Sequence, residues 1–488
     1  MRISTTVVVL FAAATTASAQ VPVDTARQLA GIAREAARIG ARHGESIWPG
    51  FRPDTIPIVF VLPSRGDMLF GWRGSLPRGY APIPESTGAA WRDGRAPGAA
   101  STAVMIEGKR VAQVVVTALE PSGLVATALH EAFHVFELAS QQPGRKFGRG
   151  ENSILVSTYP VFDVENEAAF ALEGKILAQA IAAPSLARKR ELARAFVGVR
   201  RERHRRLPIE FAEFEVLSEL HEGLAEYVLV RALTVETTDA PAEWRPAAAR
   251  ALAGRRALLD GLTESDGLSL RFRFYQTGPA QALLLDALAG ATWKADMLRE
   301  NATMQDMLAI ASGVDAVAVA ARASAETSIG LRSLRRTAGA SVARLKASRQ
   351  AMADSLLSLP GLRLVLAADS LPGRNFNSCG YDPQNLLQVT ASVRLQMRWW
   401  RPCAGGPTYA EFNVPSVHDA AAGTISAVIG AEGDVTLTSG GAAVTIRDGE
   451  TLRDVRTLKL QAPRASVEAV RADISRRGPV LTILPRTP

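Results

Sequence analysis

The sequence predicts an α+β protein in which a small sheet, a helical lobe and a β-rich module follow one another along the chain. Short β-branched runs lie before residue 120, helical spacing of apolar residues dominates from 121 to about 358, and alternating runs return after 361. This change of period carries the prediction, because one face repeats about every 3.6 residues in a helix and every second residue in a strand. A chain of 488 residues is long enough for two or three units.

Residues 1–19 are typical of an export signal, with a basic Arg2, an apolar run over 7–14 and small residues at 17–19 before Gln20. We therefore expect a periplasmic or extracellular protein. The apolar run is shorter than the roughly 20 residues that a membrane-spanning helix needs, and no later stretch approaches that length. No transmembrane segment is expected.

Before residue 120 the sequence predicts one helix and three strands. Residues 24–39 have apolar side chains at helical spacing, 57–62 form a β-branched run, and the runs 103–106 and 111–116 flank a turn. The segment 71–98, which is rich in Pro, Gly and Arg, predicts an irregular loop.

The helical part begins with a helix at 121–138, where Pro121 and Ser122 are suitable first residues. Helical spacing then dominates from 164 to about 357. Breaks are expected near Pro184, Pro208, Pro241 and Gly278-Pro279.

After residue 361 the alternation of apolar and polar residues predicts strands. The alternating runs lie at 362–366, 389–397, 424–429, 435–438, 443–446 and 480–483. We expect one domain over 20–358, with its sheet part at about 50–120 and its helical part at about 121–358, and a β module over 361–488. The module contains the only cysteines, Cys379 and Cys403. Export to an oxidising compartment favours a disulfide between them, and two free thiols are the alternative.

The chain is basic, with 56 Lys and Arg against 48 Asp and Glu and a net charge of +8. The basic residues do not alternate with aromatic residues, so nucleic-acid binding is not expected. The run at 200–206 predicts a solvated helix face, and a surface that docks an anionic polymer or lipid is the alternative. The positive net charge also allows a weak electrostatic association of the protein with an anionic envelope surface.

A metal site is predicted at His130-Glu131-Ala132-Phe133-His134, in the middle of the helix at 121–138. Positions i and i+4 share a helix face, so His130 and His134 can direct two imidazoles at one cation. Glu131 lies beside them and is a candidate general base. The chain has only six histidines, and two of them have this spacing in an apolar helix. We expect one Zn²⁺ per chain, although other divalent ions bind such residues.

The third ligand is expected in the apolar helix that contains residues 219–227. Glu222 is the preferred candidate, and Glu226, one turn later, would hydrogen-bond a ligating histidine. His221 and Glu167 are the alternatives for the third ligand, because both offer atoms that zinc accepts.

The chain contains three segments in this order: His130-Glu131-x-x-His134, Glu222-Gly223-x-Ala225-Glu226 and Tyr275-Gln276-Thr277-Gly278. Together they resemble the gluzincin metallopeptidases, the group that includes thermolysin and the aminopeptidase-N-like enzymes. The resemblance covers about residues 100–300. It implies a zincin-like catalytic domain, made of a small sheet, an active-site helix and a helical lobe, with a C-terminal β-rich module attached. It also implies zinc ligation by His130, His134 and Glu222, with Glu131 as general base and Tyr275 as transition-state stabiliser.

The sequence departs from the family pattern at three places. His221 stands where the family has Asn, and the long gap from His134 to Glu222 requires an inserted helical pair over 164–206. No Gly-x-Met-Glu-Asn segment precedes the zinc helix. Aminopeptidase specificity therefore does not carry over.

The function that these residues predict is a secreted zinc metallopeptidase that cleaves peptide or protein substrates with a zinc-activated water. A phenol such as that of Tyr275 can stabilise the oxyanion, and an ordinary interfacial tyrosine is the alternative. Two other functions stay open: a catalytically silent zincin scaffold that binds the envelope, and a zinc hydrolase of a non-peptide amide or ester.

Overall fold

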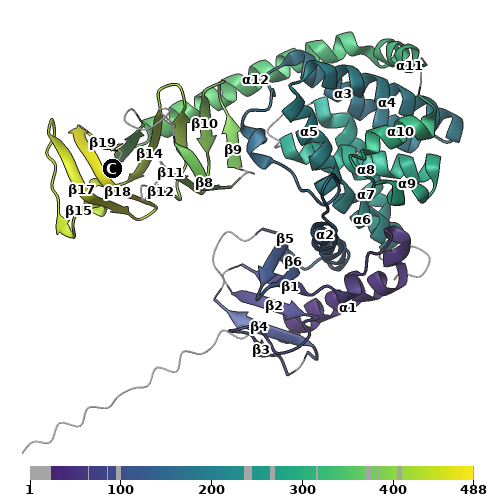
Figure 1. Cartoon of the computed structure of the whole chain (residues 1–488), viewed down its shortest axis with the longest axis horizontal. Coiled ribbons are helices and arrows are strands. Elements are labelled where there is room, and N and C mark those ends of the chain that lie inside the picture. The colour runs from purple at the N-terminus through teal and green to yellow at the C-terminus, as the bar shows by residue number, and fades with distance from the viewer. Residues whose placement is uncertain are drawn as a thin grey trace, which may run out of the picture. The chain divides into compact units, whose positions relative to one another are not determined.

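The computed structural model shows a mixed α/β chain with a β-rich C-terminal sheet (Figure 1). It describes residues 23–486 apart from 64, 85, 95–99, 236–243, 264–269, 315–316, 369–375, 383–384 and 404–408. The predicted export signal at 1–19 lies outside the described residues. Among the helices that are described, none is long and apolar enough to cross a membrane.

The chain divides into two compact units. The first contains Met1–Gly148 and Ala225–Leu252, and the second contains Arg149–Leu224 and Ala253–Pro488. The change from helices to strands that the sequence predicts at 358–361 falls inside the second unit.

The first unit contains a six-stranded sheet with strand order β3-β4-β2-β1-β6-β5. Its strands are β1 (Ile58–Leu62), β2 (Gly66–Phe70), β3 (Ala81–Pro82), β4 (Ala89–Asp93), β5 (Thr102–Ile106) and β6 (Lys109–Val115). Strands β1 and β6 are parallel, and the other neighbours are antiparallel. The three strands predicted at 57–62, 103–106 and 111–116 are thereby confirmed. The irregular loop predicted over 71–98 is wrong where β3 and β4 lie, because pairing with β2 makes β4 a strand despite its weak local pattern.

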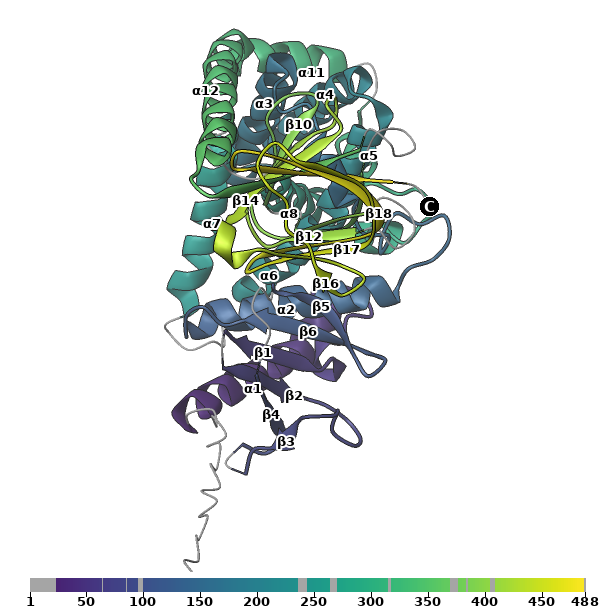
Figure 2. The ribbon, with the colours of Figure 1, turned by 90° about the vertical axis from the view of Figure 1, so that its left-hand side faces the viewer.

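Two helices, α1 (Val23–Ile47) and α2 (Pro121–Ala139), pack against each other in the same unit. Figure 2 shows α2 running along the sheet beside β5 and β6, which it contacts. The helix predicted at 24–39 is confirmed and is longer than expected. Helix α2 matches the prediction of 121–138, with Pro121 in its first turn and Glu120 accepting a hydrogen bond from the Gly123 backbone as N-cap.

From residue 164 the chain is mainly helical to Ser358, as the sequence predicts. The helices are α3 (Val164–Ala182), α4 (Leu186–Arg206), α5 (Ile209–Ser218), α6 (Leu224–Val235), α7 (Trp244–Asp260), α8 (Leu270–Ala289), α9 (Thr292–Asp296), α10 (Met304–Ser312), α11 (Val317–Ala325) and α12 (Leu331–Ser358). Two π-helical turns, η3 (Glu219–Gly223) and η5 (Glu326–Gly330), interrupt this series. The helical pair expected over 164–206 is present as α3 and α4.

The C-terminal part of the second unit is a 13-stranded sheet. Its strands are β7 (Leu362–Ala367), β8 (Asn377–Tyr381), β9 (Leu386–Gln388), β10 (Val393–Gln396), β11 (Trp400–Cys403), β12 (Tyr409–Phe412), β13 (Ser416–Asp419), β14 (Thr424–Gly430), β15 (Thr436–Ser439), β16 (Ala442–Ala443), β17 (Thr451–Ala462), β18 (Ala465–Arg477) and β19 (Val480–Pro485). A disulfide joins Cys379 in β8 to Cys403 in β11, whose Cα atoms lie 5.8 Å apart. Helix α12 extends from the helical lobe to this sheet (Figure 1), where Ala353 packs with Val389, Leu395 and Val417.

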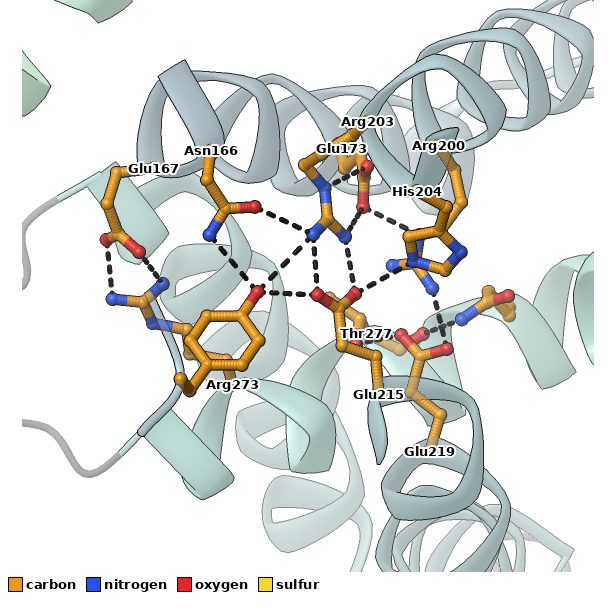
Figure 3. Close-up of polar contacts among 12 residues, drawn as sticks. Asn166, Glu167, Glu173, Arg200, Arg203, His204, Glu215, Glu219, Arg273 and Thr277 are labelled. Carbon is orange, nitrogen blue, oxygen red and sulfur yellow. Dashed lines mark hydrogen bonds and ion pairs between the residues drawn. The ribbon is translucent and has the colours of Figure 1, made fainter. Parts of the chain in front are cut away.

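The solvated face predicted for residues 200–206 is wrong for two of its arginines. Arg200 and Arg203 are buried, and each pairs with Glu173 of α3 (Figure 3). The two arginines are three residues apart and therefore share one face of α4, which packs against α3. Arg205 and Arg206, on the outer face, are exposed as expected and pair with Glu202.

The helix break predicted at Gly278-Pro279 is also wrong, because Pro279 lies inside α8. Proline has no N–H to donate to the carbonyl four residues earlier, which here belongs to Tyr275. The guanidinium of Arg255 donates a hydrogen bond to that carbonyl instead, and a second to the Gln276 side chain at 3.0 Å. A side chain from α7 thus satisfies the backbone group that Pro279 leaves without its helical donor.

We expect Arg255→Met to lower the free energy of unfolding by about 1–3 kcal/mol, the usual cost of leaving a buried polar group unsatisfied. Adding Pro279→Ala to Arg255→Met should recover part of this loss, since the new N–H at position 279 can bond to the Tyr275 carbonyl. Urea unfolding of the two variants and the parent measures both effects. Equal or greater loss in the double variant would contradict this account of α8.

A second prediction concerns His418 of β13, which is buried against Trp400 with ring centroids 5.1 Å apart. Burial, together with the charge of Arg394, outweighs Asp419 and lowers the pKa of His418 from 6.5 to about 4. Between these pH values the unfolded chain binds more protons, so the free energy of unfolding falls as the pH falls.

The part of the fall in the free energy of unfolding that is due to His418 should reach about 3 kcal/mol by pH 4. The variant His418→Gln should not show this part of the fall. The measurement is urea unfolding of parent and variant at pH 7.0, 5.5 and 4.5, which cancels the titration of carboxyl groups common to both. A stability difference between them that stays constant over this range would show that His418 does not titrate as described.

Candidate metal centre

Helix α2 presents the predicted histidines and glutamate in a buried setting. His130, Glu131 and His134 are 6%, 5% and 5% exposed. Aromatic rings fix the helix: Phe133 packs edge-on against Trp48 and Phe51 at centroid distances of 5.3 and 5.4 Å. Polar side chains in such surroundings are costly unless they have partners.

The two imidazoles of α2 face each other through their Nε2 atoms, which lie 3.2 Å apart. The rings are nearly perpendicular, with an interplanar angle of 79°. Two nitrogens that each lie about 2.05 Å from a tetrahedral zinc are separated by about 3.3 Å. The spacing of the histidine nitrogens therefore fits a single zinc-sized cation between them.

Each imidazole also has a carboxylate at its other nitrogen. The Nδ1 atom of His130 lies 3.2 Å from Oε2 of Glu226, and Nδ1 of His134 lies 3.4 Å from Oε2 of Glu137. An ionised carboxylate only accepts hydrogen bonds, so a tautomer with the N–H on Nδ1 would satisfy it and turn the Nε2 lone pair of that ring toward the neighbouring ring. Carboxylates behind ligating histidines fix the ring orientation and the tautomer in many metal sites.

Glu222 lies in the π-helical turn η3, which is continuous with α5 before it and α6 after it. One turn later in the same helical run is Glu226, the residue that contacts His130. Ligand atoms of His130, His134 and Glu222 lie within 4.8 Å of one another, and all three residues are buried. This group could hold a metal ion, and two imidazoles with one carboxylate are a donor set that suits zinc.

A close approach of two backbones holds the turn that carries Glu222. A Cβ atom on Gly223 would lie 2.7 Å from the Cα of Gly278, and one on Gly278 would lie 2.6 Å from the Cα of Gly223. Neither position therefore accepts a larger residue without a shift of α8 against η3. Gly223 belongs to the second of the three sequence segments and Gly278 to the third. Both glycines therefore serve to let η3 and α8 lie close together.

The carboxylate of Glu222 is part of a charged group in the second unit. Arg271 of α8 forms ion pairs with Glu222 and with Glu151, and its Nη1 lies 3.2 Å from the Tyr275 hydroxyl. Burial, followed by the negative charge of Glu222 and a hydrogen bond to it, raises the pKa of Tyr275 well above its usual value. Tyr275 therefore keeps its hydroxyl proton at neutral pH and lies beside the predicted carboxylate ligand.

The two alternatives for the third ligand differ in where they lie. His221 belongs to a second potential ligand group, with His134 and Glu137. Glu167 belongs to neither of the two groups found among the described residues, and both its oxygens accept hydrogen bonds from Arg273 at 2.8 and 2.7 Å. The structure therefore favours Glu222 over Glu167.

Sequence reasoning missed Glu137, Arg271 and Glu151. The first two have a local pattern that could have indicated them, because Glu137 is three residues after His134 and Arg271 is four residues before Tyr275 on the same helix faces. Glu151 has no such pattern, since it joins Arg271 from a distant part of the sequence.

No family model, curated protein or solved structure matches the chain. The resemblance to gluzincins therefore stays a prediction that rests on the three sequence motifs.

We expect the purified protein to bind about one zinc per chain, and Glu222→Ala to abolish this binding. Glu137→Gln and Glu226→Gln should weaken it by about 10–100-fold, as is usual for carboxylates behind ligating histidines. Glu167→Gln is the matched control and should leave the affinity unchanged. Competition with a chromophoric chelator measures all four. Loss of zinc with Glu167→Gln but not with Glu222→Ala would refute the ligand assignment.

Proposed function

We propose that the protein is an exported zinc metallopeptidase that hydrolyses peptide bonds. The observation that carries this proposal is the histidine pair of α2, whose Nε2 atoms lie 3.2 Å apart and whose Nδ1 atoms each face a carboxylate. Two nitrogens at this separation match the spacing that a tetrahedral zinc imposes on two of its ligands, and carboxylates behind the rings are typical of ligating histidines. Export rests on the composition of residues 1–19.

The bound cation would supply Lewis acidity, which lowers the pKa of a water molecule and polarises a carbonyl oxygen. The chain's own residues supply the proton transfers. Glu131 follows the first histidine on a buried turn of α2, so its carboxylate can take a proton from the attacking water and give it to the leaving amine.

Tyr275 would stabilise the negative charge that develops on the carbonyl oxygen. Its raised pKa keeps the hydroxyl protonated, and Arg271, 3.2 Å from the hydroxyl, holds it beside Glu222. A donor that already has this position is worth roughly 3 kcal/mol to the transition state. Tyr275 is therefore assigned as the oxyanion donor and Arg271 as the residue that positions it.

The decisive variant is Glu131→Gln, which keeps the size of the side chain but removes the proton acceptor. We expect it to bind zinc like the parent and to lose at least about 100-fold in the cleavage rate of unfolded casein or a mixed peptide library. Glu210→Gln, at an exposed position of α5, is the control and should cleave like the parent.

Three contrary outcomes have different meanings. Cleavage by zinc-loaded Glu131→Gln at the parent's rate would refute the proton-transfer role. A parent that binds zinc but cleaves only non-peptide amides or esters would be a hydrolase with the same residues and another substrate. A parent that binds envelope material after chelation and cleaves nothing would be a silent zincin scaffold.

A further inference from the structure

We infer that Thr277 and Arg200 act as positioning residues for the metal site, because together they fix the side chain of Glu219 and hence the turn that carries Glu222. Glu219 is the first residue of the π-helical turn η3, and Glu222 is the fourth. This inference deepens the proposed metal site and rests on it.

The side chain of Glu219 is held at both oxygens. Arg200 of α4 donates to Oε2 at 2.7 Å, and the Thr277 hydroxyl of α8 donates to Oε1 (Figure 3). Glu219 is 3% exposed, and Arg200 and Thr277 are fully buried. Hydrogen bonds to a charged group in such surroundings are strong and directional, so the start of the turn has little freedom.

The guanidinium of Arg200 is itself held by a second carboxylate. Its Nε donates to Glu173 of α3 at 2.7 Å, and Glu173 also accepts from Arg203. Arg203 in turn pairs with Glu215 of α5. The helices α3, α4 and α5 thus position the Glu219 carboxylate through buried ion pairs, which could not be displaced without leaving a charge unpaired, and α8 adds the Thr277 hydroxyl.

The backbone at Glu219 is restrained at the same place. A Cβ on Gly278, the residue after Thr277, would lie 2.9 Å from the Glu219 carbonyl oxygen and 2.6 Å from the Cα of Gly223. Thr277 therefore contacts the first residue of the π-helical turn through its hydroxyl. Gly278, which has no side chain, contacts the first and last residues of the turn through its backbone.

The consequence for Glu222 follows from helix geometry. A π-helical turn contains one residue more than an α-helical turn, which rotates everything after it by about 100°. If the turn relaxed to regular helix, Glu222 and Glu226 would change direction relative to α5. Such turns persist where surrounding contacts enforce them, and here the contacts of Glu219 act together with the close approach of Gly223 and Gly278.

The test compares two buried hydroxyls in the same network. Thr277→Val removes the hydroxyl that bonds to Glu219. Tyr159→Phe removes one that bonds to Glu215 at 2.5 Å and to Asn166 at 3.2 Å, so it is at least as disruptive but does not touch the π-helical turn. Thr277→Ser restores the hydroxyl and serves as the rescue variant.

Two readouts are needed. Amide hydrogen exchange in residues 219–224 of the metal-free protein should speed up by about 10-fold in Thr277→Val and stay within about 2-fold of the parent in Tyr159→Phe. Zinc affinity, measured by chelator competition, should fall by about 10–100-fold in Thr277→Val only, and Thr277→Ser should restore it.

Equal effects of Thr277→Val and Tyr159→Phe on both readouts would overturn the inference, because the hydroxyl would then be merely structural. Failure of the parent to bind zinc would overturn the proposed function instead. In that case the exchange comparison, which needs no metal, still decides whether Thr277 positions the turn.

Discussion

The burial of two guanidinium groups, those of Arg200 and Arg203, is the constraint on which the helical lobe depends. A buried charge costs several kcal/mol unless carboxylates surround it with good geometry. Glu173, Glu215 and Glu219 do this, and they come from α3, α5 and the π-helical turn (Figure 3). Apolar packing alone tolerates sliding of one helix past another, whereas these bonds do not. The register of the helices in the lobe is therefore set by ion pairs.

The same constraint explains why the candidate ligand Glu222 lies in an irregular turn. Glu219 belongs both to the ion-pair network and to the turn that contains Glu222, so the lobe determines the direction of that carboxylate. The two histidines of α2 do not depend on tertiary contacts in this way, because the spacing of residues along one helix brings His130 and His134 together. One part of the candidate site comes from local geometry and the other from tertiary contacts.

This difference decides what could be predicted from the sequence. The spacing of His130 and His134, and of Glu222 and Glu226, is a property of one helix and was visible in the sequence. The burial of Arg200 depends on Glu173 in another helix, and the helical position of Pro279 depends on Arg255, so local patterns gave the wrong answer for both. The long pair β17 and β18 escaped prediction for a related reason: much of β17 is exposed and charged, and its strand form comes from pairing with β18.

A metal bound between the histidines of α2 would also link metal binding to folding. The helix holds two Nε2 atoms 3.2 Å apart, and Glu137 and Glu226 lie at the Nδ1 atoms of the same rings. Without a cation the two rings contact each other directly, and a cation between them would be bound by both nitrogens. The unfolded chain does not bring these nitrogens together and so offers no such site. A cation that binds only the folded state stabilises it by RT ln(1 + [L]/Kd), so zinc at the proposed site would raise the free energy of unfolding as its concentration rises.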